Sequence, residues 1–82
     1  MTTPALNADM KRIIEVTKEL LHQQGTAGST SEVIAAAFIL DDVSCLPNSY
    51  PNMIDAWDRL GEWQYYVRVI REHYRHLIVF KA

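Results

Sequence analysis

The hydrophobic positions of the chain fall into three blocks, and the first and third of these have helical spacing. The first block covers residues 8–24, and its apolar stripe consists of Met10, Ile13, Ile14, Thr17, Leu20 and Leu21. Asn7 is placed to cap the start of a helix, Asp9 suits its positive end, and Gly25 suits its stop. The first block therefore predicts an amphipathic helix.

The second block is apolar on every side of a helical wheel. Ser29 and Glu32 have the spacing of a capping box, in which each side chain accepts a hydrogen bond from the other's backbone N–H. A buried strand also fits the run from Val33 to Leu40, but three consecutive alanines favour a helix over about residues 30–43. Asp41 and Asp42 oppose the helix dipole and predict fraying or an early stop.

The third block follows a loop that contains Pro47 and Pro51, and it is the longest pattern in the chain. Steps of three and four run without a slip through Met53, Ala56, Leu60, Trp63, Val67, Ile70, Tyr74 and Leu77. This phase continues past Gly61, so it predicts one helix over about 52–79, either straight or kinked at that glycine. Residues 76–80 could instead form a short strand.

Together these elements predict a single all-α domain over residues 1–82, a small bundle of two short helices and one long C-terminal helix. Two short helices cannot cover one long apolar face, so the uncovered part calls for another chain. Two-fold association is the commonest solution, which predicts a homodimer. The expected contact residues are Tyr66, Ile70, Tyr74, Leu77 and Phe80.

Composition narrows the class of protein without identifying it. The formal net charge is −2, which is no footprint of a general binder of nucleic acid or of membrane surfaces. The only cysteine, Cys45, cannot form an internal disulfide. No stretch reads as a secretory signal or is long enough to span a bilayer, so a cytoplasmic protein is expected, with no membrane contact.

Positive charge is concentrated late in the chain, where the sequence from Gln64 onward contains four basic residues and one acidic residue. Arg68, Arg71 and Arg75 recur at helical spacing beside Tyr65, which makes these four residues the candidate interaction surface. Arginine offers forked donors to phosphate and a planar face for stacking, but such a stripe is also typical of a solvated helix face. A helix-turn-helix is disfavoured, because the second block has no basic side chain to present to DNA.

Groups for catalysis are sparse. His73 and His76 could share a zinc ion but lack further ligands at a recognisable spacing, and Cys45 has no partner of the Cys-x-x-Cys type. Phosphate loops, nucleophile elbows and calcium loops are missing from the sequence. The expectation is a non-enzyme without catalytic residues, metal or cofactor.

The aromatic residues of the last block favour a protein interface, because Tyr, Trp and Arg are enriched where proteins meet. The preferred hypothesis is a non-enzymatic protein–protein interaction module, of the adaptor or inhibitor type, that acts through the aromatic and Arg-rich C-terminal helix. The alternative is a nucleic-acid-binding regulator that uses Arg68, Arg71 and Arg75. A steep salt dependence of binding to DNA or RNA would favour the alternative.

Overall fold

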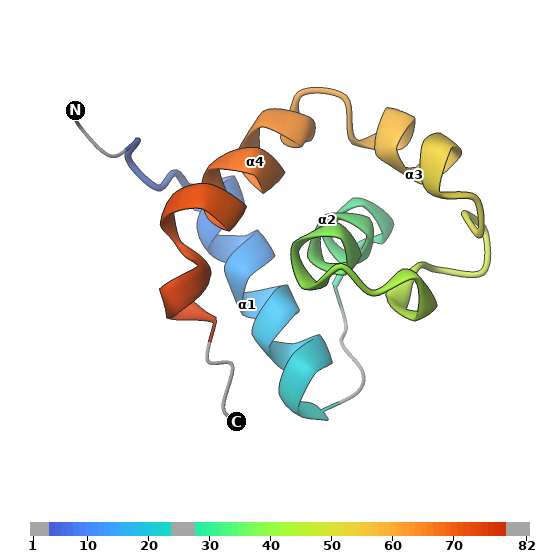
Figure 1. Cartoon of the computed structure of the whole chain (residues 1–82), viewed down its shortest axis with the longest axis horizontal. Helices are drawn as coiled ribbons and strands as arrows, with labels where there is room; N and C mark the ends of the chain where they lie inside the picture. Colours follow the sequence, from blue (N-terminus) through green and yellow to red (C-terminus); the bar gives the residue numbers. More distant parts are fainter. Residues whose placement is uncertain (1–3, 24–27, 79–82) are drawn as a thin grey trace.

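A computed structural model describes residues 4–23 and 28–78, and within these ranges all regular structure is helical (Figure 1). This confirms the all-α prediction. The elements, in chain order, are α1 (Ala8–Gln23), α2 (Thr30–Leu40), the 3₁₀ turn η1 (Val43–Cys45), α3 (Met53–Leu60), α4 (Trp63–His73) and the 3₁₀ turn η2 (Arg75–Leu77). The described part measures 38 × 30 × 20 Å.

Helix α1 begins where the sequence predicts. The Asn7 side chain accepts a hydrogen bond from the backbone N–H of Met10 at 2.8 Å, which caps the first turn. The buried face of α1 consists of Met10, Ile13, Ile14, Val16 and Thr17. The Thr17 hydroxyl donates to the carbonyl of Ile13 at 2.7 Å, so this buried polar group is satisfied within the helix. Gln24 and Gly25, the predicted end and stop, lie outside the described residues.

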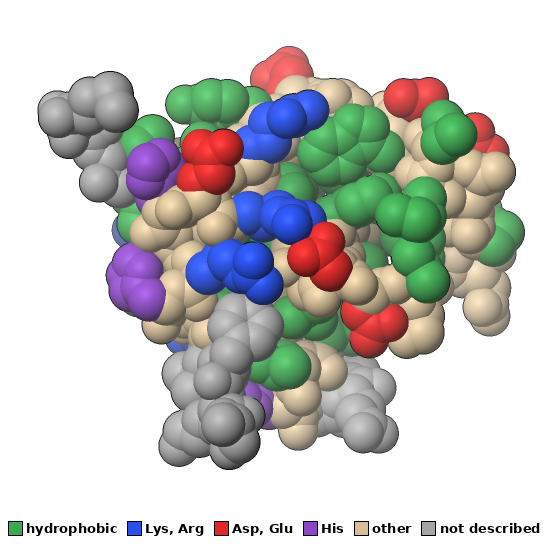
Figure 2. Space-filling model, in the orientation of Figure 1, with side chains coloured by type: hydrophobic (Ala, Val, Ile, Leu, Met, Phe, Trp, Pro, Cys, Tyr) green, Lys and Arg blue, Asp and Glu red, His purple; other side chains and the backbone are tan. Residues whose placement is uncertain are grey.

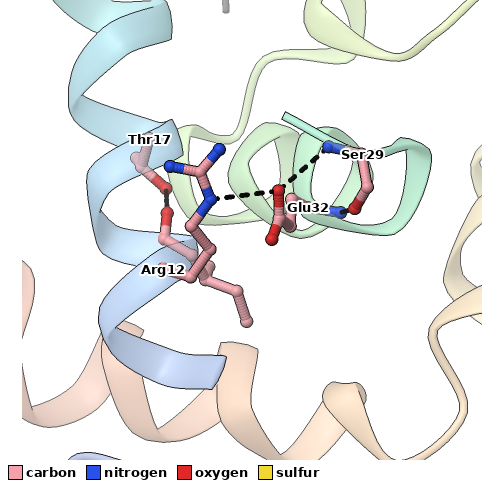
Figure 3. A network of polar contacts seen from close by, with 5 residues as sticks. Arg12, Thr17, Ser29 and Glu32 are labelled. Atoms are coloured by element: carbon pink, nitrogen blue, oxygen red, sulfur yellow. Dashed lines mark hydrogen bonds and ion pairs between the residues drawn. The ribbon is translucent and has the colours of Figure 1, made fainter. Parts of the chain in front are cut away.

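The predicted capping box at the start of α2 is present, and α1 reinforces it (Figure 3). The backbone N–H of Ser29 donates to Glu32 Oε1 at 2.9 Å, and the N–H of Glu32 donates to Ser29 Oγ at 3.3 Å. The same Glu32 oxygen lies 3.3 Å from Nε of Arg12 on α1. One carboxylate therefore both caps α2 and joins it to α1.

Helix α2 lies at the centre of the molecule and contacts α1, α3, α4 and η1 (Figure 1). Its buried side chains are Ile34, Ala35, Ala36, Ala37 and Ile39. An element surrounded on several sides must be apolar around most of its circumference, which explains why this segment has no polar face. The helical prediction is confirmed, and the strand alternative is wrong.

The end of α2 comes earlier than the predicted residue 43. Asp41 adopts the left-handed conformation, with φ 55° and ψ 38°, so the helix stops at Leu40. The N–H groups of Asp41 and Asp42 turn back to the carbonyls of Phe38 and Ala37, at 3.3 and 3.0 Å. This arrangement satisfies carbonyls that a helix end otherwise leaves unpaired.

The single helix predicted over 52–79 is wrong: the segment is divided at Gly61. Gly61 has φ 54° and ψ −120°, and Glu62 has φ −61° and ψ −25°, which are the angles of a type II′ turn. The first of these conformations suits glycine alone, and it turns the chain between α3 and α4. The Gln64 side-chain amide donates to the carbonyl of Trp57 at 2.9 Å and so satisfies the end of α3.

The chain after α4 packs against its own domain. Helix α4 ends at His73, and η2 leads to Ile78, which is extended and 1% exposed. The Tyr74 hydroxyl donates a hydrogen bond to the carbonyl of Pro4, which ties this segment to the start of the chain. Residues 76–78 are therefore neither continuous helix nor strand, while Val79 and Phe80 lie outside the described residues.

The division at Gly61 removes the premise of the length argument for a homodimer. Two helices of 8 and 11 residues replace one long rod, and both pack on α2. Their buried positions (Ala56, Leu60, Val67, Val69 and Ile70) share one core with α1 and α2. Among the described residues, no helix is long and apolar enough to cross a membrane.

Candidate functional site

A groove with two halves crosses the face of the molecule formed by α2, η1, α3 and α4. One half is a hollow of about 70 Å³ lined by Ala37, Phe38, Asp41, Asp42, Val43, Leu46 and Met53. The other is an open hollow of about 290 Å³ lined by Phe38, Trp57, Val67, Arg68 and Arg71. Because Phe38 lines both, we call the whole surface the Phe38 groove, with an aliphatic half and an aromatic half.

The aromatic half combines two rings and a cation. Phe38 on α2 and Trp57 on α3 meet edge to face, with ring centroids 5.0 Å apart. The guanidinium carbon of Arg68 on α4 lies 5.5 Å from the centroid of the Trp57 ring. Both contacts have favourable geometry for aromatic groups, and the rings stay only partly buried. Three helices thus place two aromatic rings beside a positive charge.

Arg71 lies at the middle of the groove and holds the end of α2. Its Nη1 and Nη2 donate to the two carboxylate oxygens of Asp41 at 2.6 and 3.0 Å. Nη1 also donates to the carbonyl of Phe38 at 2.8 Å. A cation at this position complements the negative end of the helix dipole and satisfies one of its last carbonyls. Arg71 therefore has a structural task and a nearly neutralised charge.

Asp42 lines the aliphatic half. Its carboxylate accepts hydrogen bonds from the hydroxyl of Ser44 at 2.6 Å and from the backbone N–H of Ser44 at 3.0 Å. These bonds, that from the hydroxyl first, lower the pKa of Asp42, so the group stays ionised at neutral pH. Nearby, partial burial raises the pKa of the Cys45 thiol, with the charge of Asp42 as a second cause, so Cys45 is a weak nucleophile.

The aliphatic half exposes side chains that are usually buried. Val43 is 56% exposed and Met53 is 49% exposed, and both line the same hollow as Leu46. Figure 2 shows hydrophobic side chains gathered on this face beside a group of basic and acidic side chains. A contiguous apolar surface with a charged rim is typical of protein interaction sites.

The structure separates the four residues of the predicted interaction surface. Arg68 and Arg71 both line the aromatic half. Arg75 lies beyond α4, in η2, so the regular helical stripe ends before it. Tyr65 is 59% exposed but is not among the residues that line the groove, and its ring lies beside that of Tyr66, with centroids 6.3 Å apart.

The predicted dimer contacts are mostly engaged within the chain. Ile70 is fully buried in the core, and Tyr66, Tyr74 and Leu77 are partly buried against it. Phe80 lies outside the described residues. Ile70 is therefore absent from the surface that a partner could touch.

Sequence reasoning missed most of the residues that form the groove. Phe38, Val43 and Trp57 come from three different elements, and no sequence pattern connects them. The sequence held one indication of the ion pair between Arg71 and Asp41: two aspartates at the negative end of a helix need a nearby cation. Which residue supplies that cation depends on how α4 packs against α2, because Arg71 lies 30 residues after Asp41.

Metal binding and known relatives add no further assignment. In residues 4–23 and 28–78, no group of three or more His, Cys, Asp or Glu side chains is placed to hold a metal ion. His73 lies 3.9 Å from Glu72 on the same helix. Comparisons with protein families, with curated proteins and with solved structures gave no match to this chain. Function is therefore argued from the Phe38 groove alone.

Proposed function

We propose that this protein is a non-enzymatic protein–protein interaction module, an adaptor or inhibitor, whose docking surface is the Phe38 groove. The observation that carries the proposal is the half-exposed pair Val43 and Met53, continuous through Phe38 with the Trp57 and Arg68 surface. A partner that places apolar side chains here would remove exposed hydrocarbon from water. Tryptophan and arginine are also the residue types that most often dominate interface energies.

The state of the polar groups in the groove supports binding rather than catalysis. Arg71 and Asp41 are bonded to each other, and Asp42 is bonded to Ser44. General acid–base chemistry needs a group directed at a substrate with a pKa near the working pH. Asp42 has a lowered pKa instead, and Cys45 a raised one, which disfavours a thiolate nucleophile.

The nucleic-acid alternative is weaker on electrostatic grounds. Arg71 forms an ion pair with Asp41, in which Nη1 lies 2.6 Å from Oδ1. Asp42 adds a negative charge to the same face. Phosphate binding requires uncompensated cations, and each one engaged adds to the salt dependence of affinity. Arg68 remains in the groove, and Arg75 lies outside it. The cytoplasm is the compartment we propose, because a lone cysteine suits a reducing environment.

The test is quantitative affinity capture from extracts of the source cell, with the wild type and two matched variants. Met53→Asp places a charge in the aliphatic half at the first position of α3, where the helix dipole tolerates an acid. Lys18→Glu changes an exposed residue on α1, outside the groove. A true partner is retained by the wild type and Lys18→Glu and is lost with Met53→Asp. If every captured protein binds all three chains equally, the proposal fails.

The alternative is tested in the same variants with labelled DNA and RNA. The proposal expects weak binding that Arg68→Gln leaves nearly unchanged. A steep loss of affinity with salt, reduced by about one unit of slope in Arg68→Gln, would favour the nucleic-acid function.

A further inference from the structure

The two halves of the Phe38 groove carry opposite charges. Arg68 lies in the aromatic half, Asp42 lies in the aliphatic half, and the mutually neutralised pair of Arg71 and Asp41 borders both. Phe38 connects the two halves. The aromatic half therefore carries a cation, the aliphatic half carries an anion, and a compensated ion pair links the two halves. Figure 2 shows basic and acidic side chains side by side next to the hydrophobic patch.

A surface with this order is complementary to itself. Rotation by 180° about an axis that lies in the plane of the interface near Phe38, perpendicular to the length of the groove, turns a second copy to face the first and exchanges the positive end with the negative end. A second copy placed face to face in this way brings unlike charges together at both ends and apolar groups together at the centre. Closed two-fold association requires one patch that matches its own rotated image. Like charges would meet if the two copies were instead aligned in the same direction.

We infer that the occupant of the Phe38 groove is a second copy of this chain, in a two-fold homodimer. In it, Arg68 faces Asp42 of the partner subunit, and Val43 and Met53 are covered by the aromatic half of the partner subunit. This inference rests on the proposed function, because it assigns a partner to the same docking surface. It also moves the dimer contact away from the α4 residues Tyr66 and Ile70 to a face that the folded chain leaves exposed.

The energetic basis is hydrophobic at the centre and electrostatic at the ends. A stable small interface buries about 800 Å² on each partner, with an apolar core and a polar rim. The half-exposed Val43 and Met53 supply such a core, and Phe38 and Trp57 extend it. The ion pairs at the ends contribute direction more than affinity, because exposed pairs are individually weak. Charge reversal should therefore weaken the dimer and show which charged residues face each other in it.

The deciding experiment uses two charge-reversal variants, Arg68→Glu and Asp42→Lys, in sedimentation equilibrium. The wild type should dimerise at protein concentrations of up to about 100 µM. Each variant alone brings like charges together twice, so its self-association should fall about tenfold or more. In an equimolar mixture, each chain carries the charge that the other needs at both ends. The mixture should form a heterodimer with nearly wild-type affinity.

Met53→Asp provides a second route in case Asp42→Lys disturbs η1, which Asp42 caps. It should abolish the dimer without changing the helix content, whereas Lys18→Glu should leave the dimer intact. A wild-type species of 9.4 kDa throughout, an unchanged Met53→Asp dimer, or a mixture of folded charge variants no tighter than either alone would overturn the inference.

The two proposals fail in distinguishable ways. If the protein is a 9.4 kDa monomer that still captures a different protein through Met53, the homodimer is refuted and the interaction module is supported. If the protein is a homodimer that captures no other protein, the dimer is supported and the adaptor or inhibitor function is refuted.

Discussion

The segment up to the end of α2 and the segment from α3 onward both have hydrophobic patterns that indicate helices, but the two segments fold in different ways. In the first segment, each block of the pattern is one helix with its own cap, Asn7 for α1 and Ser29 for α2. In the second, one uninterrupted pattern covers two helices, a type II′ turn at Gly61 and a 3₁₀ turn. The difference shows what periodicity reports. It indicates which residues face the core, and it is silent about whether the helix axis continues.

The break is compatible with the pattern because both helices use the same core. Leu60, before the turn, and Val67, after it, are buried in one cluster around α2. Their spacing of seven residues would place them on one face of a straight helix, and the turn places them on two helices that converge. Only the backbone angles of Gly61 distinguish the two arrangements.

The largest effect is expected at Ile70, where the two interpretations of α4 diverge. Ile70→Ala should lower the free energy of unfolding by about 2–5 kcal/mol, because the side chain is fully buried within the chain. Ile54→Ala, at a position 72% exposed on α3, is the matched control and should change it by less than about 0.5 kcal/mol. Urea unfolding at two protein concentrations checks this. A loss of stability only at the higher concentration would make Ile70 a dimer contact instead.

Substitution of Gly61 distinguishes a turn from a continuous helix, because the two arrangements predict opposite changes in stability. At φ 54° an L-residue is strained, so Gly61→Ala should destabilise the protein by about 1–3 kcal/mol. Within one continuous helix, the same change would stabilise it by about 1 kcal/mol. Thermal unfolding of both proteins gives the answer.

A chemically synthesised chain with D-alanine at position 61 supplies the control. The angles φ 54° and ψ −120° are the mirror image of an extended conformation, which a D-residue adopts freely. D-alanine should therefore keep or raise the stability, and equal losses for both alanines would refute the turn.

Arg71 tests the contact through which the second segment holds the first. Arg71→Gln should lower the free energy of unfolding by about 1–2 kcal/mol, since Asp41 and the carbonyl of Phe38 lose a charged donor. Arg68→Gln, three residues earlier on α4, loses a contact over Trp57 and should lower it by about 0.5 kcal/mol. Equal effects in chemical unfolding would mean that the two arginines have the same role.

The smallest effect is expected at the cap of α2. Ser29→Ala removes the acceptor for the N–H of Glu32 and should lower the free energy of unfolding by about 1 kcal/mol. Thr30→Ala, at the exposed neighbouring position, is the control and should be nearly neutral. An unfolding midpoint for Ser29→Ala equal to that of the control would show that the hydrogen bond to Ser29 Oγ does not stabilise the start of α2.

Local signals in the sequence sufficed for α1, α2 and their caps, because each depends on residues within one turn of the chain. The capping box needs only Ser29 and Glu32, and the central position of α2 follows from its lack of a polar face. The Phe38 groove depends on residues from four elements, which no short-range pattern connects. Asp41 and Asp42 indicated an early stop of α2 although the predicted helix ran to residue 43, whereas the partner of Asp41, Arg71, depends on the packing of α4.

The apolar circumference of α2 has a consequence for synthesis on the ribosome. When α2 has left the exit tunnel, α1 is the one helix able to cover it, because α3 and α4 come later in the chain. Until residues 53–73 follow, Ile34 and Ile39 cannot both be shielded by their final neighbours. Partly synthesised chains of this kind expose the surface that promotes aggregation and recruits chaperones. Ribosome-bound chains that end shortly after Pro51 should be the most dependent on such assistance.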